Sequence, residues 1–175
     1  MSKKLLAQEI YKASHITGDF LLRSGQRSNE YFDKYMFTSD PTLLDVISEE
    51  LVNLVPKGTE VLAGLEMGAI PLAAALSMKT GIPATYVRKE AKAYGTCKVA
   101  EGSNVKGKKV CIIEDVVTTG GQILLSVKDL REQGADVSHV LCVIRRNPNA
   151  TEILAAEGLE LRPLLTMEFI KECVS

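Results

Sequence analysis

Short apolar runs alternate with amphipathic segments along most of this chain, and this alternation constrains its fold more than any other feature. The runs have the length and β-branched content of buried strands, and they lie at 61–64, 83–87, 109–114, 137–144 and 159–165. Segments with helical spacing of apolar residues lie at 41–54, 69–79, 121–133 and 149–157, and another ends the chain. This order predicts an α/β fold in which a parallel sheet with right-handed crossovers is flanked by helices.

The first forty residues follow a different pattern. Residues 1–14 have the amphipathic spacing of a helix, and Asp19–Arg23 and Tyr31–Tyr35 predict two short strands around the polar turn Ser24–Asn29. We expect these residues to cover one end of the sheet as a small hood. The chain, 1–175, then forms one domain, with the hood at about 1–40 and the α/β core at about 41–165.

Charge and hydropathy exclude several classes of protein. The chain carries 21 basic and 22 acidic side chains, so its net charge of −1 gives no overall field that attracts nucleic acid or a membrane surface. No apolar stretch has the length of a membrane span, and the N-terminal segment lacks the apolar core of a secretory signal. We therefore expect a cytoplasmic protein that binds neither nucleic acid nor membranes.

The cysteines and histidines predict neither a disulfide framework nor a zinc centre. The cysteines show no paired spacing, and most lie in or beside apolar runs, which favours buried free thiols. They are Cys97, Cys111, Cys142 and Cys173, of which Cys97 is the one expected to be exposed. His15 and His139 have no partner at metal-ligand spacing, so a His-based metal site or catalytic triad is not expected.

The stretch Val110–Gln122, VCIIEDVVTTGGQ, carries the clearest chemical signal. Glu114 and Asp115 come at the carboxyl end of an apolar strand, which is where open α/β sheets bind their ligands. The turn Thr118–Gly121 precedes a helix, whose free N–H groups can hold a phosphate, while the carboxylates can accept hydrogen bonds from sugar hydroxyls. The alternative, an ordinary strand, turn and helix, does not account for the Thr-Thr-Gly-Gly sequence beside the acidic pair. The stretch therefore predicts a sugar-phosphate site.

This stretch resembles the 5-phosphoribosyl 1-diphosphate signature of the type I phosphoribosyltransferases. The resemblance implies the type I fold, a parallel sheet flanked by helices with a small N-terminal hood. It also implies that Glu114 and Asp115 hold the ribose hydroxyls and that the following turn holds the 5′-phosphate. The residues of this turn and its approach are Val116, Val117, Thr118, Thr119, Gly120 and Gly121.

A second turn, Gly64–Ala69, also joins an expected strand to an expected helix, so its amides can bind another anion. A tight turn without a ligand is the alternative when this segment is taken alone. In the family this place is the pyrophosphate turn, which implies contacts from Glu66, Met67 and Gly68. Some members have lysine where this chain has Gly68, so the resemblance requires part of the positive charge to come from elsewhere or from a metal ion.

A long polar connection, expected to be a mobile loop at about 88–106, follows the strand at 83–87. Compact domains seldom keep so long a loop without a use for it, although a merely solvated, charged loop is the alternative. The sequence RKEAKAYGTCKVAEG resembles the catalytic loop of the orotate phosphoribosyltransferases. The resemblance gives Arg88, Lys89, Lys92 and Tyr94 contacts with the diphosphate donor, and bacterial members often have His at the place of Tyr94. Catalytic roles are expected for Lys92, Arg88 and Asp115.

The N-terminal segment RSGQRS, followed by Tyr31 and Phe32, resembles the acceptor-side motif of the same enzymes. Orotate is a flat anion, so its recognition needs an aromatic face and a cation. An aromatic hairpin packed into a minor core is the alternative. The orotate contacts that the resemblance implies are Arg23, Tyr31, Phe32, Thr118 and Arg146.

Together these motifs imply transfer of the phosphoribosyl group to orotate, giving orotidine 5′-monophosphate and pyrophosphate. Mg²⁺ is the expected cofactor, bound mainly through the pyrophosphate, with Asp115 the side chain considered as an additional ligand. The family also implies a homodimer in which the loop of one subunit reaches the other's site. Two alternatives stay open: a phosphoribosyltransferase for another base, such as a purine, and a nucleotide-sensing regulator that keeps the sugar-phosphate site without catalysis.

Overall fold

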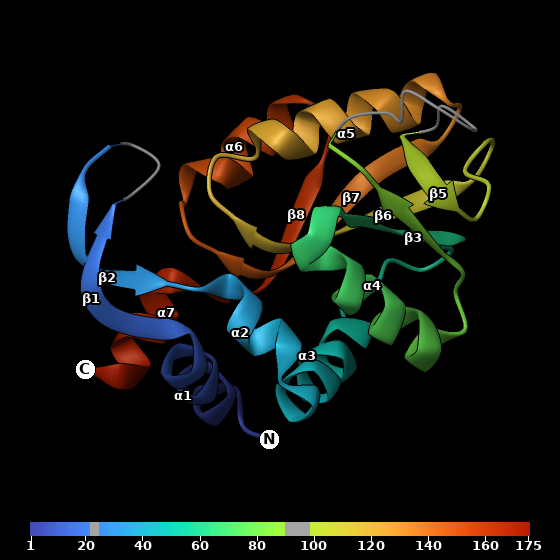
Figure 1. Ribbon diagram of the computed structural model, residues 1–175. Coiled ribbons are helices and arrows are strands. Elements are labelled where there is room, and N and C mark those ends of the chain that lie inside the picture. The colour runs from blue at the N-terminus through green and yellow to red at the C-terminus, as the bar shows by residue number, and fades with distance from the viewer. Residues whose placement is uncertain (22–24, 90–98) are drawn as a thin grey trace.

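The computed structural model describes residues 1–21, 25–89 and 99–175, and within them a six-stranded sheet forms the centre of the molecule (Figure 1). Its strand order is β5-β4-β3-β6-β7-β8, and every neighbouring pair is parallel except β4 and β5, which are antiparallel. The predicted α/β fold is thereby confirmed. The strands are β3 (Val61–Leu65), β4 (Ala84–Val87), β5 (Ala100–Gly102), β6 (Lys109–Val117), β7 (Asp136–Arg145) and β8 (Glu160–Thr166).

Helices cover both faces of this sheet, as Figure 1 shows. Successive strand residues point to opposite faces, so Ile113 packs in one core with α1, α3, α4 and α7, while Ile112 packs in the other core with α5 and α6. The helices are α1 (Lys3–Ser14), α2 (Lys34–Ser39), α3 (Pro41–Val52), α4 (Glu66–Thr80), α5 (Gly121–Glu132), α6 (Asn149–Ala156) and α7 (Met167–Val174).

The N-terminal residues form the predicted helix and hairpin, but the limits of the strands differ from those expected. The hairpin pairs β1 (His15–Leu21) with β2 (Arg27–Phe32) in antiparallel register. The prediction of a strand over Tyr31–Tyr35 was wrong beyond Phe32, because the Asp33 side chain accepts a hydrogen bond from the backbone N–H of Tyr35 and starts α2. The chain therefore turns into a helix immediately after the hairpin.

Two other differences concern the sheet. The strand expected at 109–114 continues to Val117, because its pairing with β7 continues past the acidic pair. The expected loop at 88–106 contains β5, which pairs with β4 at the edge of the sheet. Loop positions 90–98, including Lys92 and Tyr94, lie outside the described residues.

The described cysteines are buried free thiols, as expected, and they are Cys111, Cys142 and Cys173. Burial raises the pKa of the Cys111 thiol to about 12, so this thiol stays protonated near neutral pH. Cys97 lies outside the described residues. Within the described part of the chain, no helix is long and apolar enough to cross a membrane.

Candidate active site

The acidic pair lies in the last part of β6, where the strand approaches the N-terminus of α5. Asp115 has no exposed surface, and Glu114 is half-buried. The backbone N–H of Asp115 donates a 2.9 Å hydrogen bond to Oε1 of Glu114. Burial, the side-chain hydrogen bond to Asp115 and the charge of Asp115 raise the pKa of Glu114 well above its ordinary value. Glu114 therefore takes up a proton more readily than an ordinary carboxyl group.

A lysine that the sequence analysis did not identify contacts this pair. Nζ of Lys34 lies 3.0 Å from Oδ1 and 2.9 Å from Oδ2 of Asp115, although the two residues are 81 positions apart. Oδ1 also accepts a 2.6 Å hydrogen bond from the backbone N–H of Val116. No local pattern joins a lysine at the start of a short helix to a distant strand, so the sequence alone offered no signal for this contact.

The predicted phosphate turn has the backbone that anion binding requires. Gly120 is the N-cap of α5 and has a φ of 81°, in the left-handed region that glycine adopts without strain. It supplies no side-chain cap, so the N–H groups in the first turn of α5 stay available to an anion, and the helix dipole favours one there. Thr118 and Thr119 are exposed beside this turn. Their hydroxyls are therefore accessible to the same anion.

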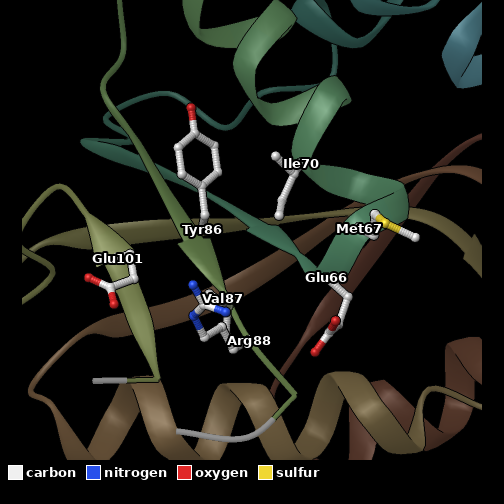
Figure 2. Close-up of a pocket in the computed structure, with 7 residues that line it drawn as sticks. All are labelled: Glu66, Met67, Ile70, Tyr86, Val87, Arg88 and Glu101. Atoms are coloured by element: carbon white, nitrogen blue, oxygen red, sulfur yellow. The ribbon is translucent and has the colours of Figure 1, made fainter. Parts of the chain in front are cut away.

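The predicted pyrophosphate turn and the start of the predicted catalytic loop line one cavity of about 400 Å³. Figure 2 shows Glu66 and Met67 at the start of α4 on one side, with Arg88 at the end of β4 and Glu101 of β5 on the other. Glu66 has a φ of 53°, which is unusual for a residue with a side chain and typical of functional turns. The full lining is Glu66, Met67, Ile70, Tyr86, Val87, Arg88 and Glu101.

Gly68, the third residue predicted in this turn, lies against the acidic pair. A Cβ atom at this position would lie 1.8 Å from Oδ2 of Asp115, so the turn has room there for hydrogen alone. Arg88 and the neighbouring Lys89 are exposed where the chain leaves β4. The two predicted anion sites thus meet at the carboxyl ends of β3 and β6.

A second cavity, of about 220 Å³, brings together the aromatic pair Tyr31 and Phe32 with Arg146. Arg146 follows β7, and its backbone N–H donates a 2.8 Å hydrogen bond to the carbonyl of Val117. Thr118 does not line this cavity, and Arg23 lies outside the described residues. The lining is Tyr11, His15, Ser28, Glu30, Tyr31, Phe32, Arg146, Met167 and Lys171.

His15 and Lys171 were not predicted as site residues. The His15 ring stacks on Tyr11 with centroids 4.6 Å apart, and its Nε2 lies 2.9 Å from Oε2 of Glu30. The hydrogen bond to His15 lowers the pKa of Glu30, and the charges of Lys171 and Arg146 act in the same direction. The cavity therefore combines an aromatic wall with two cations, Arg146 and Lys171, a combination suited to a flat anion.

No metal centre made of protein side chains is evident in the described parts of the chain. Within residues 1–21, 25–89 and 99–175, no three His, Cys, Asp or Glu side chains are grouped so that they could hold a metal ion. The two oxygens of Asp115 already face the ammonium group of Lys34. A metal ion at this site would therefore need most of its ligands from a bound substrate.

Comparisons with known proteins agree on one family. Residues 42–160 match the family model of the phosphoribosyl transferase domain. An orotate phosphoribosyltransferase from a Nocardioides species is 52% identical over 161 residues, which are 92% of this chain and 90% of that protein.

Two solved structures of orotate phosphoribosyltransferase from Mycobacterium tuberculosis H37Rv share the fold over nearly the whole chain. The complex with Fe(III) dicitrate has a TM-score of 0.86 and 33% identity, covering 96% of this chain and 98% of that one. The complex with 5-phospho-alpha-D-ribosyl 1-diphosphate has a TM-score of 0.82 and 30% identity, covering 97% of this chain and 98% of that one. The similarity thus includes both the hood and the sheet.

Proposed function

The chain belongs to the phosphoribosyltransferase family, and from this premise we propose that it is an orotate phosphoribosyltransferase of pyrimidine biosynthesis. It joins orotate to the ribose of 5-phosphoribosyl 1-diphosphate and releases pyrophosphate. One observation carries this proposal: Tyr31, Phe32 and Arg146 line one cavity, and Arg146 is hydrogen-bonded through its backbone to the strand that bears the acidic pair. An aromatic, cationic acceptor site thereby adjoins a sugar-phosphate site.

The donor is held mainly by β6 and the turn that follows it. Glu114 and Asp115 accept hydrogen bonds from the ribose hydroxyls, and the segment Val116–Gly121 binds the 5′-phosphate through its amides and threonine hydroxyls. The φ of 81° at Gly120 supports this role, because it directs the first amides of α5 toward a bound anion.

The pyrophosphate group lies between the turn at Glu66, Met67 and Gly68 and the catalytic loop. The shared cavity of Glu66, Met67 and Arg88 supports this arrangement. Arg88 and Lys89 are exposed at the start of the loop, and Lys92 and Tyr94 lie outside the described residues. Cations here favour departure of a highly charged leaving group, so Arg88 and Lys92 act as catalytic residues together with Asp115.

The acceptor lies against Tyr31, Phe32 and Arg146 in the second cavity. The further proposed contacts are with Arg23, which lies outside the described residues, and with Thr118, which is exposed but does not line that cavity. A ring nitrogen of deprotonated orotate forms the new bond to the anomeric carbon of ribose as the bond from that carbon to pyrophosphate breaks. The electron pair of the broken bond leaves with pyrophosphate. Because the nitrogen has already lost its proton, the protein needs no strong base and acts by orientation and electrostatics.

Mg²⁺ is the proposed cofactor. When bound, it neutralises charge on the pyrophosphate and holds that group in position. The side chains fit a metal ion that is held mainly by oxygen atoms of the substrate. Among the described residues, no three possible side-chain ligands lie together, and both oxygens of Asp115 face Lys34.

A panel of bases tests this proposal against its alternatives. The protein is incubated with Mg²⁺, 5-phosphoribosyl 1-diphosphate and orotate, adenine or hypoxanthine, while ultraviolet absorbance and pyrophosphate release are followed. We expect turnover with orotate alone. Turnover with a purine but not orotate would favour the transferase for another base, and donor binding without turnover of any base would favour the regulator.

We also propose a cytoplasmic homodimer in which the catalytic loop of one subunit completes the site of the other. Support for the cytoplasm is the set of buried free thiols, which suits a reducing compartment. Mixing inactive Asp115→Asn and Lys92→Ala chains tests the shared site, because a mixed dimer would contain one site with both native residues. Activity should return after subunit exchange, and its absence would argue against sharing.

A further inference from the structure

Lys34 connects the hood to the acidic pair. It is the first residue of α2, and this helix starts there because Asp33 caps the N–H of Tyr35. From this fixed position the side chain crosses to β6, where Nζ lies 3.0 Å from Oδ1 and 2.9 Å from Oδ2 of Asp115. The hood therefore contributes a cation directly to the carboxylate at the proposed ribose site.

Asp115 depends on this cation because the other groups around it do little to stabilise its buried negative charge. The side chain has no exposed surface, and its other described partners are uncharged donors: the N–H of Val116, which donates to Oδ1, and the carboxyl group of Glu114 when protonated. Oδ2 faces the backbone of Gly68. A buried carboxylate without a paired charge is costly and tends to take up a proton.

If Lys34 were absent, the other groups around Asp115 would not prevent its carboxylate from taking up a proton. Glu114, Cys142 and Tyr35 are titratable side chains near the pair, and none of them carries positive charge. The cation Arg145 also acts on Cys142, but its guanidinium group has Thr151 and Glu168 as its own partners. Burial alone would lower the pKa of Lys34, but the hydrogen bond and charge of Asp115 raise it above its usual value. The ammonium group therefore stays charged over the whole neutral range.

We propose that Lys34 is a positioning residue for phosphoribosyl transfer, which keeps Asp115 a fixed negative charge that can accept the ribose hydroxyls. The proposal rests on the proposed function, since it assumes that Asp115 binds the ribose. The resemblance to the family also calls for positive charge near Gly68, where some members have a lysine. Lys34 supplies an ammonium group close to this position, since it contacts the Asp115 carboxylate that Gly68 touches. Lys34 itself touches neither substrate in this account.

Binding of 5-phosphoribosyl 1-diphosphate without any base, measured by calorimetry from pH 6 to pH 9, tests this role. Lys34→Met should lower affinity at pH 7 by about tenfold, the effect expected when the ribose hydroxyls lose a hydrogen bond to a charged acceptor. Affinity of this variant should rise from pH 6 toward pH 9, because a higher pH favours the ionised carboxylate. Lys34→Arg keeps the charge and should keep the wild-type pH profile.

The matched control is Lys79→Met, which removes another lysine that forms an ion pair, with Asp45 at 2.8 Å, on the far end of α4. It should bind the donor as the wild type does. In steady-state assays, Lys34→Met should raise the KM for the donor and leave the KM for orotate unchanged. If the methionine variant does not fold, as judged by its thermal transition, Lys34→Gln replaces it, because glutamine also lacks the charge.

Several results would overturn the proposal. Unchanged affinity in the uncharged variants would contradict it, and so would a loss of equal size at every pH, which a merely structural role would give. A displaced pH profile in Lys34→Arg would contradict it as well. A wild-type chain that binds the donor but does not use orotate would refute the proposed acceptor alone, whereas no donor binding at all would refute both proposals.

Discussion

Gly68 and Asp115 are in such close contact that a single methyl group at position 68 would overlap the carboxylate. A Cβ atom there would lie 1.8 Å from Oδ2 and 2.7 Å from Cγ of Asp115. The carboxylate cannot easily move away, because Lys34 and the N–H of Val116 hold it. The start of α4 and the end of β6 therefore fix each other at the centre of the proposed donor site.

Gly68→Ala should destabilise the protein and weaken donor binding together. Overpacking a buried contact costs about 1–3 kcal/mol of unfolding free energy, measurable by urea denaturation. The same change in an Asp115→Ser background should cost much less, because the shorter side chain leaves room for the methyl group. An equal loss in both backgrounds would show that the contact with Asp115 is not the cause.

Glu114→Gln should stabilise the protein at neutral and higher pH while it weakens donor binding. The pKa of Glu114 is raised in the folded state, so the folded chain takes up a proton more readily than the unfolded chain. Stability is therefore lost as pH rises from the ordinary carboxyl value of 4.5 through the raised value. Glutamine carries no charge and avoids this loss.

The difference in unfolding free energy between Glu114→Gln and the wild type should be about 1–3 kcal/mol at pH 8, the cost of an incompletely compensated buried polar group. It should shrink toward pH 4.5, as thermal melts across this range would show. Glu172→Gln, at an exposed position, serves as the control and should show no such trend. A difference between Glu114→Gln and the wild type that is the same at pH 4.5 and pH 8 would contradict the argument.

The two glycines of the phosphate turn should respond differently to alanine. Gly120 has a φ of 81° and Leu154 would lie 3.1 Å from its added Cβ, so Gly120→Ala should cost about 1–2 kcal/mol or more. The φ of Gly121 lies outside the left-handed region, and a Cβ atom added there would have Oγ1 of Thr119 as its nearest neighbour, at 3.9 Å. Gly121→Ala should therefore be tolerated or slightly stabilising at the start of α5. Chemical denaturation of both variants checks this, and equal losses would be inconsistent with the described turn.

The sequence predicted the core of the sheet well because the signals for its elements are local. The apolar runs of β6 and β7 and the helical spacing of apolar residues in α3 depend on neighbouring residues alone. The chemical signature of the phosphate turn is local too, since Thr118 to Gly121 adjoin the strand that carries the carboxylates.

The missed features depend on contacts between distant parts of the chain. The extension of β6 to Val117 follows from pairing with β7, and β5 forms only because β4 provides an edge. The ion pair of Lys34 with Asp115 needs the hood to pack over the sheet before the two side chains can meet. Periodicity and local motifs carry no information about such contacts.

The most direct test of the proposed activity is to identify the products. Wild-type protein is incubated with orotate, 5-phosphoribosyl 1-diphosphate and Mg²⁺, and nucleotide and pyrophosphate are quantified separately, with Asp115→Asn as the inactive control. We predict orotidine 5′-monophosphate and pyrophosphate in equal amounts. Pyrophosphate released without the nucleotide, or no reaction with orotate under conditions where the donor binds, would contradict the proposed transfer.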